Sequence, residues 1–237
     1  MDKLPAYISL IFGLTTIATA WLFYKATKNP GTTLIILLLW LILHTVLGLS
    51  GFYTVTNTVP PRFLLMVLPP LLFIIGLFVT VKGRKYLDSL NIRSLAILHI
   101  VRIPVELVLF LLFINKVVPK LMTFEGRNFD ILSGLTAPVI YYLGFIKQKI
   151  DKKIILVWNI VCLALLVNIV VLAILSAPFL FQKFAFDQPN IAVLYFPFVW
   201  LPCCVVPLVL LSHLATIRQL LKEQRKIPSN KSILQSR

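Results

Sequence analysis

The chain has 237 residues, of which 59% are hydrophobic and only 13% are charged, and its mean hydropathy is +0.94. A soluble domain has about 25% charged residues, so this composition excludes an ordinary soluble protein. The formal net charge is +15, but the basic residues are distributed among short loops between apolar runs. They form no basic surface interleaved with aromatic residues, which argues against nucleic acid as a partner.

Seven apolar segments follow one another along the chain, and each approaches the ~20 residues that a helix needs to cross a ~30 Å hydrocarbon core. Solid apolar runs predict helices, whereas a transmembrane β-barrel has short alternating segments. We therefore expect an all-α, polytopic helix bundle as a single domain over residues 1–220, followed by a short basic cytoplasmic tail over 221–237. The expected spans are 6–24, 33–53, 63–81, 94–117, 129–146, 154–177 and 192–214.

Lysine and arginine residues predict the orientation of the bundle, because they are enriched in cytoplasmic loops. With the N-terminus outside, sixteen of them fall on the inner side and six on the outer side, while Arg102 lies within the membrane. We therefore expect an N-outside, C-inside topology. The small residues Ala18 and Ala20 resemble a signal-peptidase site. However, Asp2 offsets the charge of Lys3 ahead of the first span, so we expect this helix to be retained.

Prolines interrupt several of the expected spans. Each proline removes a backbone donor and frees a carbonyl about one turn earlier. In hydrocarbon that carbonyl needs a partner from a neighbouring helix, a side chain or water. We therefore expect the third and seventh spans to be kinked and packed inside the bundle. The prolines concerned are Pro69, Pro70, Pro104, Pro138, Pro197, Pro202 and Pro207.

Ionisable residues inside the apolar runs are concentrated in the fourth span, in the segment HIVRIPVELVLF. At 3.6 residues per turn, His99, Arg102 and Glu106 fall within an arc of about 60° on one helix face. Because a charge near the helix centre costs roughly 2.5–3.5 kcal/mol, this face should point into the bundle. Arg102 and Glu106 are four residues apart and could form an ion pair. The pair is either structural or part of a polar site for an anion, a proton or a substrate headgroup. Asn159, in the sixth span, is expected to hydrogen-bond to another helix.

The three histidines of the chain all lie inside expected spans. Together with the charged pair they define a candidate intramembrane polar site, made of His44, His99, Arg102, Glu106 and His213. Two histidines at similar depth, His99 and His213, could also be the axial ligands of a b-type haem. The sequence has no HExxH or CxxCH motif, and we predict neither a metal nor a cofactor, with the haem as the alternative.

The segment MTFEGRNFDILSG, residues 122–134, is the most distinctive of the loops expected on the outer side. It gathers Glu125, Arg127, Asn128 and Asp130 just before the fifth span. Asn128 and Asp130 are also suited to cap the N-terminus of that helix, but capping accounts for only one of the four residues. We therefore interpret this loop as a candidate outer-face binding site.

The segments HIVRIPVELVLF, TFEGRNFDILSGLTAP and AFDQPNIAVLYFPFVWLP carry a family resemblance. With them the chain resembles an uncharacterised family of bacterial multi-pass, seven-span inner-membrane proteins over nearly its whole length. The resemblance implies a location in the bacterial cytoplasmic membrane. It implies no known activity and therefore assigns no functional residues.

Three classes of function are compatible with these features. The internal polar face and the broken helices favour a transporter or permease, or a binder of a small solute or lipid headgroup. The internal histidines and Glu106 would also suit a membrane-embedded enzyme or a b-haem redox protein. A non-catalytic scaffold or sensor subunit, with outer loops that bind a protein partner, is the third class. We interpret the chain as a membrane protein with a polar pocket for a small solute or lipid headgroup, with the lipid bilayer as its surrounding partner.

Overall fold

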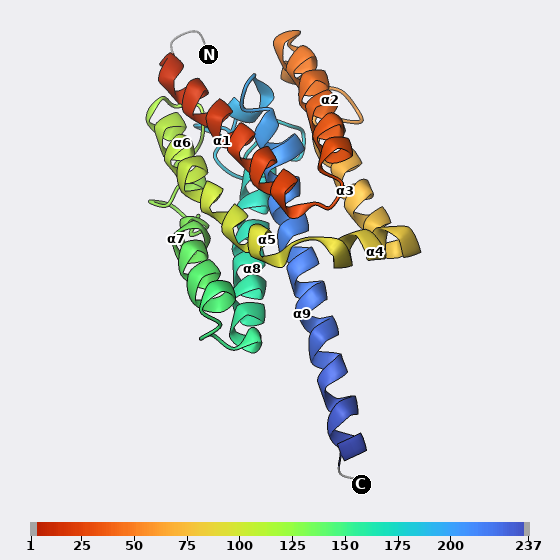
Figure 1. The fold of residues 1–237 in the computed structure, drawn as a ribbon. Coiled ribbons are helices and arrows are strands. Elements are labelled where there is room, and N and C mark those ends of the chain that lie inside the picture. Colours follow the sequence, from red (N-terminus) through yellow and green to blue (C-terminus); the bar gives the residue numbers. More distant parts are fainter. Residues whose placement is uncertain (1–3, 235–237) are drawn as a thin grey trace.

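The computed structural model describes residues 4–234, with side chains described through Arg225, and this part of the chain is helical without a β-strand. Figure 1 shows the helices gathered into one bundle, through which α9 runs. The described part of the chain is all-helical and contains five segments long and apolar enough to cross a membrane. They are α1 (Ala6–Ala26), α2 (Pro30–Leu49), the run Ile92–Ile114, α8 (Lys152–Leu175) and the run Leu201–Arg225.

Two of these segments change their helical type along their length, each beside a proline. The fourth expected span consists of α5 (Ile92–Leu98), a 3-10 turn η2 (His99–Val101) and α6 (Arg102–Ile114). The last segment begins with a π-helical turn, η6 (Leu201–Val205), and continues as α9 (Val206–Leu234). A proline cannot donate the hydrogen bond of a regular α-helix, so the backbone tightens or widens around it.

The third and fifth expected spans are shorter than the hydrocarbon core. The helix α3 (Leu64–Val79) has 16 residues and bends by 95° into α4 (Val81–Ser89). The fifth consists of α7 (Ile131–Val139), with 9 residues, and a π-helical stretch η4 (Ile140–Ile146), with 7. At 1.5 Å per residue, 16 residues cover about 24 Å. Length alone therefore identifies five spans, and the other two apolar helices fall short of the usual ~20 residues.

The inner segment that follows α3 is helical, where the sequence suggested only a short loop. Its helix α4 begins at Thr80, whose hydroxyl accepts a hydrogen bond from the backbone N–H of Gly83 at 3.1 Å. Leu87 is buried against the bundle, while Lys82 and Lys85 are exposed. An amphipathic helix that leaves α3 at 95° is typical of a segment that lies along a membrane surface.

The seventh span begins at Leu201 rather than at residue 192. The preceding residues form a short 3-10 turn, η5 (Ala192–Leu194), and a series of turns around Pro197. The residue before a proline is disfavoured in the α-helical region, which explains why an apolar stretch long enough to extend the span folds as a loop instead.

The C-terminal segment expected as a short basic tail over residues 221–237 continues α9 as a helix as far as Leu234. Figure 1 shows this part of α9 extending beyond the other helices. Residues 235–237 lie outside the described part of the chain.

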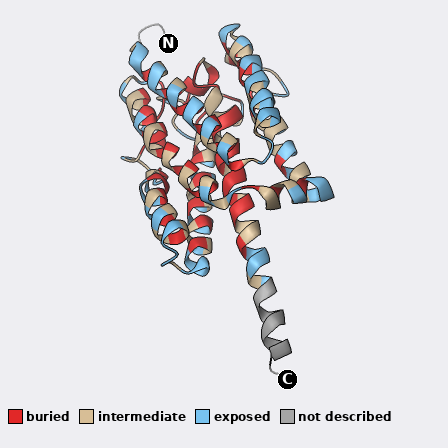
Figure 2. Cartoon of the chain, in the orientation of Figure 1, coloured by how far each residue is buried: buried red, intermediate tan, exposed pale blue. Residues whose placement is uncertain are grey.

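Burial identifies the inner and outer helices of the bundle. Figure 2 shows buried residues along α5, α6 and the first half of α9, whereas much of α2 and α3 is exposed. The exposed side chains are large and apolar, such as Leu39 with 64% and Phe73 with 58% of the surface accessible. An apolar belt of this size is expected to face lipid. The third span is therefore peripheral, contrary to the expectation from its prolines, and α3 buries only Met66 and Ile74.

Two indole N–H groups connect the peripheral helix α2 to the core. Trp40 Nε1 on α2 donates to the carbonyl of Cys203 at 2.8 Å, and Trp200 Nε1 donates to the carbonyl of Leu41 at 3.2 Å. Pro207 has no backbone N–H, so it cannot donate to the carbonyl of Cys203 four residues earlier, as a residue of a regular α-helix would. A tryptophan from a neighbouring helix thus satisfies a backbone acceptor that has no water available in the apolar interior.

At the inner end of the bundle, an ion-pair cluster joins α4 to α9. Asp88 on α4 accepts from Arg218 Nε at 2.9 Å and from Lys222 Nζ at 2.6 Å. Gln219 Nε2 donates to the carbonyls of Leu87 and Leu90 at 2.8 and 3.0 Å. Partial burial by itself would raise the pKa of the Asp88 carboxyl, but the hydrogen bonds and charges of Arg218 and Lys222 hold that pKa below its ordinary value.

We predict that Asp88→Asn lowers the free energy of unfolding by about 0.5–1 kcal/mol at neutral pH, as expected for a partly exposed ion pair. A carboxyl whose pKa is depressed in the folded state stabilises the fold above its unfolded pKa, and this contribution is lost as the pH falls through the folded value. The difference between wild type and Asp88→Asn should therefore be constant from pH 8 to 5, begin to decrease near pH 4, and disappear only below the depressed pKa of the folded state. Thermal unfolding in detergent measures it, with Glu125→Gln as the exposed control. A difference that grows on acidification would contradict the prediction.

Candidate functional site

The three ionisable residues of the fourth span lie buried on one side of that span, as the helical period predicts. His99, Arg102 and Glu106 are 0%, 2% and 1% exposed. Arg102 Nη1 donates to Asp130 Oδ1 at 2.6 Å and to the carbonyl of Cys162 at 3.3 Å. The ion pair of Arg102 is thus formed with Asp130, at the start of α7, and not with Glu106, one turn along its own helix. The expected pairing is wrong because an inward-facing guanidinium reaches across to a facing helix more easily than along its own helix surface.

Glu106 is bonded instead to an amide from the loop that precedes α7. Asn128 Nδ2 lies 2.7 and 2.6 Å from the two carboxylate oxygens of Glu106, and 3.0 Å from the carbonyl of Met122. Asn128 Oδ1 accepts from the backbone N–H of Asp130 at 3.0 Å. This one side chain therefore orients Glu106 and also holds the start of α7, next to the carboxylate that binds Arg102.

His213 on α9 is held from both sides in one tautomer. Arg102 Nη2 lies 3.0 Å from His213 Nε2, and Asn159 Oδ1 lies 2.9 Å from His213 Nδ1. A guanidinium can only donate hydrogen bonds, so Nε2 must be the acceptor and Nδ1 must carry the proton. Asn159 thus makes the interhelical bond expected from its position in the sixth span. The imidazole is neutral in this arrangement, because a proton on Nε2 would break its bond to Arg102.

His99 is stacked directly on His213, and this arrangement decides the haem alternative. The two ring centroids are 3.8 Å apart with planes inclined by 14°, and Trp158 packs edge-on against His99. Axial ligands must approach a haem iron from opposite faces of the porphyrin, with a ring nitrogen pointing at the metal. Here the rings contact each other and both nitrogens of His213 are already bonded. The pair His99–His213 therefore does not fit a b-type haem between its rings.

The loop expected as an outer-face binding site divides into an exposed half and a buried half. Glu125 and Arg127 are exposed, whereas Asn128 and Asp130 point into the bundle with 0% and 4% exposure. Glu125 makes only an exposed ion pair with Lys120, at 3.9 Å. Asp130 occupies the N-cap position of α7 without capping it, because its side chain is turned to Arg102. The four residues do not form one surface site, and two of them belong to the internal cluster.

His44 lies apart from this cluster. Its Nδ1 is 2.7 Å from the hydroxyl of Tyr53, and Trp40 packs edge-on against its ring. The helix α2 packs against α1, η1 (Phe52–Thr54) and η6, whereas the cluster is built from α6, α7, α8 and α9. Of the five residues expected in the intramembrane polar site, the structure therefore brings together His99, Arg102, Glu106 and His213.

A cavity of about 90 Å³ adjoins the part of this cluster around Glu106. Glu106 and Asp130 lie in its wall, together with Asn190, and the rest of the wall is apolar and comes from α3, α6, α8, α9 and the short turns η3 (Lys120–Met122), η5 and η6. The lining residues Val67 of α3 and Val170 of α8 are partly exposed, and next to them Leu68 and Val171 are exposed apolar side chains. We infer that the mouth of the cavity lies between these two helices and has an apolar rim.

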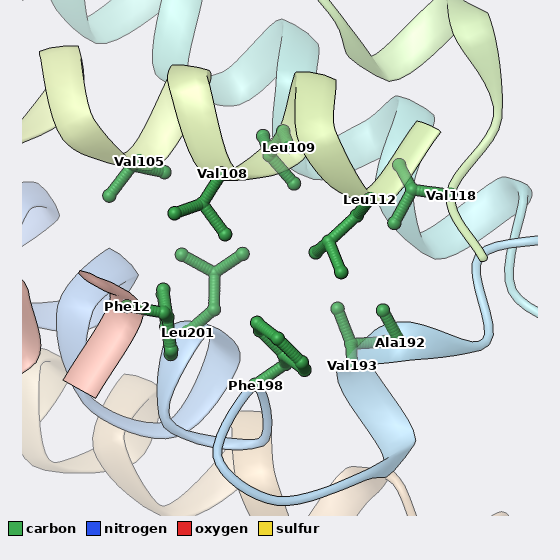
Figure 3. A pocket seen from close by; sticks show the side chains of 10 residues that line it. All are labelled: Phe12, Val105, Val108, Leu109, Leu112, Val118, Ala192, Val193, Phe198 and Leu201. Carbon is green, nitrogen blue, oxygen red and sulfur yellow. The ribbon is translucent and has the colours of Figure 1, made fainter. Parts of the chain in front are cut away.

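A second, much smaller void lies next to this cavity and shares Val105, Leu109, Val193 and Leu201 with its lining. Figure 3 shows the side chains of Val105, Val108 and Leu109 facing Phe198 and Leu201 across it. Its volume is about 10 Å³ and its lining is entirely apolar. Such a space holds at most about one water molecule and stays dry without polar partners. It is a packing gap, and the larger cavity beside Glu106 is the candidate binding site.

The charges of the cluster do not balance. Arg102 is its one cation, His213 is neutral by its hydrogen bonds, and Asp130 and Glu106 are both carboxyl groups. The ion pair accounts for Asp130, and Asn128 offers Glu106 a hydrogen bond but no charge. A lone carboxylate in an apolar interior is costly unless it is paired or neutralised. Glu106 therefore needs a proton or a cation from the cavity.

Comparison with known proteins gives a family but no activity. A domain of unknown function, DUF8737, matches residues 59–221. This range contains every residue of the buried cluster and the cavity, and His44 lies outside it. No curated protein and no solved structure matches the chain.

We predict that Arg102→Leu lowers the free energy of unfolding by about 3–5 kcal/mol, because it leaves the Asp130 carboxylate buried without its ionic partner. A second substitution, Asp130→Leu, should restore much of this loss. Glu106→Leu in the same Arg102→Leu background should restore less, because Glu106 is bonded to Asn128. Chemical or thermal unfolding in detergent ranks the three variants. A larger recovery with Glu106→Leu would contradict the assignment of the ion pair.

We also predict that Gly134→Ala destabilises the protein by about 1–3 kcal/mol. A Cβ at Gly134 would lie 2.8 Å from Ile103 Cγ1, 3.0 Å from the Ile103 nitrogen and 3.3 Å from Arg102 Cβ, so α7 would be forced away from α6. Gly76→Ala is the matched control, because its Cβ would meet no atom within 4 Å. The control should be neutral or slightly stabilising, since alanine favours helix over glycine. Equal effects of the two substitutions would exclude a close contact at Gly134.

Proposed function

The chain belongs to the DUF8737 family, whose name assigns no activity, and we therefore propose its function from the geometry of the buried site. It is a multi-pass membrane protein that binds a small solute in the cavity between α3 and α8, with Glu106 as the recognising carboxylate. The observation that carries this proposal is the unbalanced carboxylate of Glu106 in the wall of an apolar cavity. Ionisable residues inside a membrane bundle mark ligand or ion pathways more often than they serve packing alone.

The composition of the cavity wall supports binding of a solute. Small-molecule sites are concave and mostly apolar, with a few polar groups that orient the ligand. Here the polar groups are Glu106, Asp130 and Asn190, and the apolar wall includes Leu166 and Ile169 of α8. A volume of about 90 Å³ suits a small molecule or one polar end of a larger one. A lipid headgroup could therefore enter only in part.

The interrupted helix beside the cavity supports transport of the solute across the membrane, rather than binding of the solute alone. Leu201 and Pro202, in the π-helical turn η6, belong to the cavity wall. Discontinuous helices line the substrate sites of many transporters, because their irregular backbone can rearrange around the substrate. We propose that the protein is a permease or transporter of its solute, and that η6 is the part of the wall that changes shape.

The same proposal includes the topology and the location. We propose seven spans, with α3 and with α7–η4 as two short ones, because a short helix is accommodated by local thinning of the bilayer at modest cost. The excess of lysine and arginine on one side favours an outside N-terminus. The family resemblance seen in the sequence favours a bacterial cytoplasmic membrane. In this orientation the cavity lies in the outer half of the bilayer.

We predict that the full-length protein, released from its membrane and measured by native mass spectrometry, retains a bound small molecule that Glu106→Gln loses. The amide keeps the shape of the side chain but removes the charge that the solute neutralises. Val67→Phe, which places a ring at the mouth of the cavity, should reduce occupancy in the same way. Glu125→Gln, at an exposed position, is the control and should retain the adduct. Identical adducts in all four proteins would contradict a site beside Glu106.

A further inference from the structure

We infer that the ligand of the cavity is a small alkylammonium ion, that is, a protonated amine on a short apolar chain. This inference rests on the proposed solute site and names the chemical class of the solute. It follows from three properties of the wall: the direction of its hydrogen-bonding groups, its charge and its remaining apolar surface.

The polar side chains of the cavity wall offer acceptors to a ligand. Glu106 and Asp130 contribute carboxylate oxygens, which accept hydrogen bonds when ionised. Asn190 contributes its side-chain oxygen, because its Nδ2 already donates to the carbonyl of Ala173 at 3.2 Å and this bond fixes the orientation of the amide. A ligand that satisfies these groups must therefore be a hydrogen-bond donor.

Asn190 provides evidence that is independent of the carboxylates. The residue is 1% exposed, and its Oδ1 has no hydrogen-bond partner in the described part of the chain. A buried acceptor without a partner costs about 1–3 kcal/mol, so native proteins rarely leave one unless a bound group completes it. The position of Asn190 in the cavity wall assigns this free acceptor to the ligand.

The charge of the wall selects a cation. Arg102 is bound to Asp130, to the carbonyl of Cys162 and to His213, so its positive charge is directed away from a ligand. When it is ionised, Glu106 is the net negative charge that faces the cavity. An anionic or neutral ligand would leave this charge uncompensated in a medium where an isolated ion is costly.

The apolar remainder of the wall selects an organic cation over a metal ion. Ca²⁺ and similar hard cations are held by six to eight oxygen ligands. Here three polar side chains stand against apolar residues such as Val170, Ile174 and Val206. A volume of about 90 Å³ corresponds to on the order of three water molecules, which is enough for an ammonium group and the first carbons of its chain. The apolar mouth between α3 and α8 is where such a chain would lie.

The experiment compares matched four-carbon probes on the purified full-length protein in detergent at pH 7. n-Butylammonium chloride, butan-1-ol and sodium butyrate are titrated at constant ionic strength, and thermal unfolding is followed by tryptophan fluorescence. Because a ligand that binds only the folded state stabilises it, n-butylammonium should raise Tm in a saturable way. Butan-1-ol, sodium butyrate and sodium chloride should have no such effect.

Variants of cavity residues test whether the increase in Tm arises from binding in the cavity. Glu106→Gln should weaken n-butylammonium binding at least tenfold, because it removes the charge that the ammonium group neutralises. Asn190→Ala should weaken it about fivefold, as expected for the loss of one hydrogen bond. Glu125→Gln should bind like wild type. If Glu106→Gln does not fold, Asn190→Ala alone carries the test.

Each contrary outcome has a distinct meaning. Equal stabilisation by butan-1-ol would show a solute site without preference for charge, which overturns the alkylammonium assignment and leaves the proposed function standing. Equal stabilisation by sodium chloride would assign the site to an inorganic cation and would also overturn it. The absence of stabilisation by any four-carbon probe would overturn both the assignment and the proposed solute site. An unchanged n-butylammonium response in Glu106→Gln and Asn190→Ala would place the bound amine elsewhere.

Discussion

The structure depends on one buried guanidinium. Arg102 lies in the first turn of α6, and its two terminal nitrogens bind Asp130 at the start of α7, the carbonyl of Cys162 on α8 and His213 on α9. A charge of this kind is tolerated in an apolar bundle only when its donors are satisfied within the protein. The positions of three helices relative to α6 are therefore set by the geometry of a single rigid, planar group.

The other polar residues of the interior follow from this constraint. Because Arg102 uses Asp130, the helix α7 must begin close to α6, and Gly134 permits that approach by lacking a side chain. Because Arg102 donates to His213, that histidine is confined to one tautomer, and Asn159 Oδ1 accepts a hydrogen bond from its Nδ1–H group. Glu106 lies one turn farther along α6, beyond the reach of these bonds. It is thus the acidic group of the cavity wall that has no ion-pair partner within the cluster.

Periodicity in the sequence predicted the part of this site that lies on one helix. His99, Arg102 and Glu106 share a face because of the 3.6-residue repeat, and no tertiary information is needed to see it. The partner of Arg102 was not predictable in this way. Asp130 is 28 residues away, in a segment whose polar residues equally suggest a surface loop, and only the packing of α7 on α6 decides that half of them turn inward.

The ends of the helices were also predictable from the sequence only in part. Hydropathy located the apolar runs, but the true start of the last span depends on local backbone preferences around Pro197, and α4 was hidden among basic residues that read as a loop. The cavity could not be inferred from sequence, because it is formed by side chains of several helical segments that meet only in the folded bundle. The side-chain oxygen of Asn190 is the acceptor of the cavity that has no partner among the described residues. In the sequence this residue cannot be distinguished from the other polar residues of its loop.

The continuity of α9 has a mechanical consequence. His213, in the buried cluster, and Arg218, which binds Asp88 at the inner end of the bundle, are separated by five residues of unbroken α-helix, a rise of about 7.5 Å. A helix segment this short moves as a rigid body. A movement of α9 at His213 therefore also moves Arg218. The buried cluster and the amphipathic segment α4 are thereby connected through a single helix, α9, which also extends beyond the bundle.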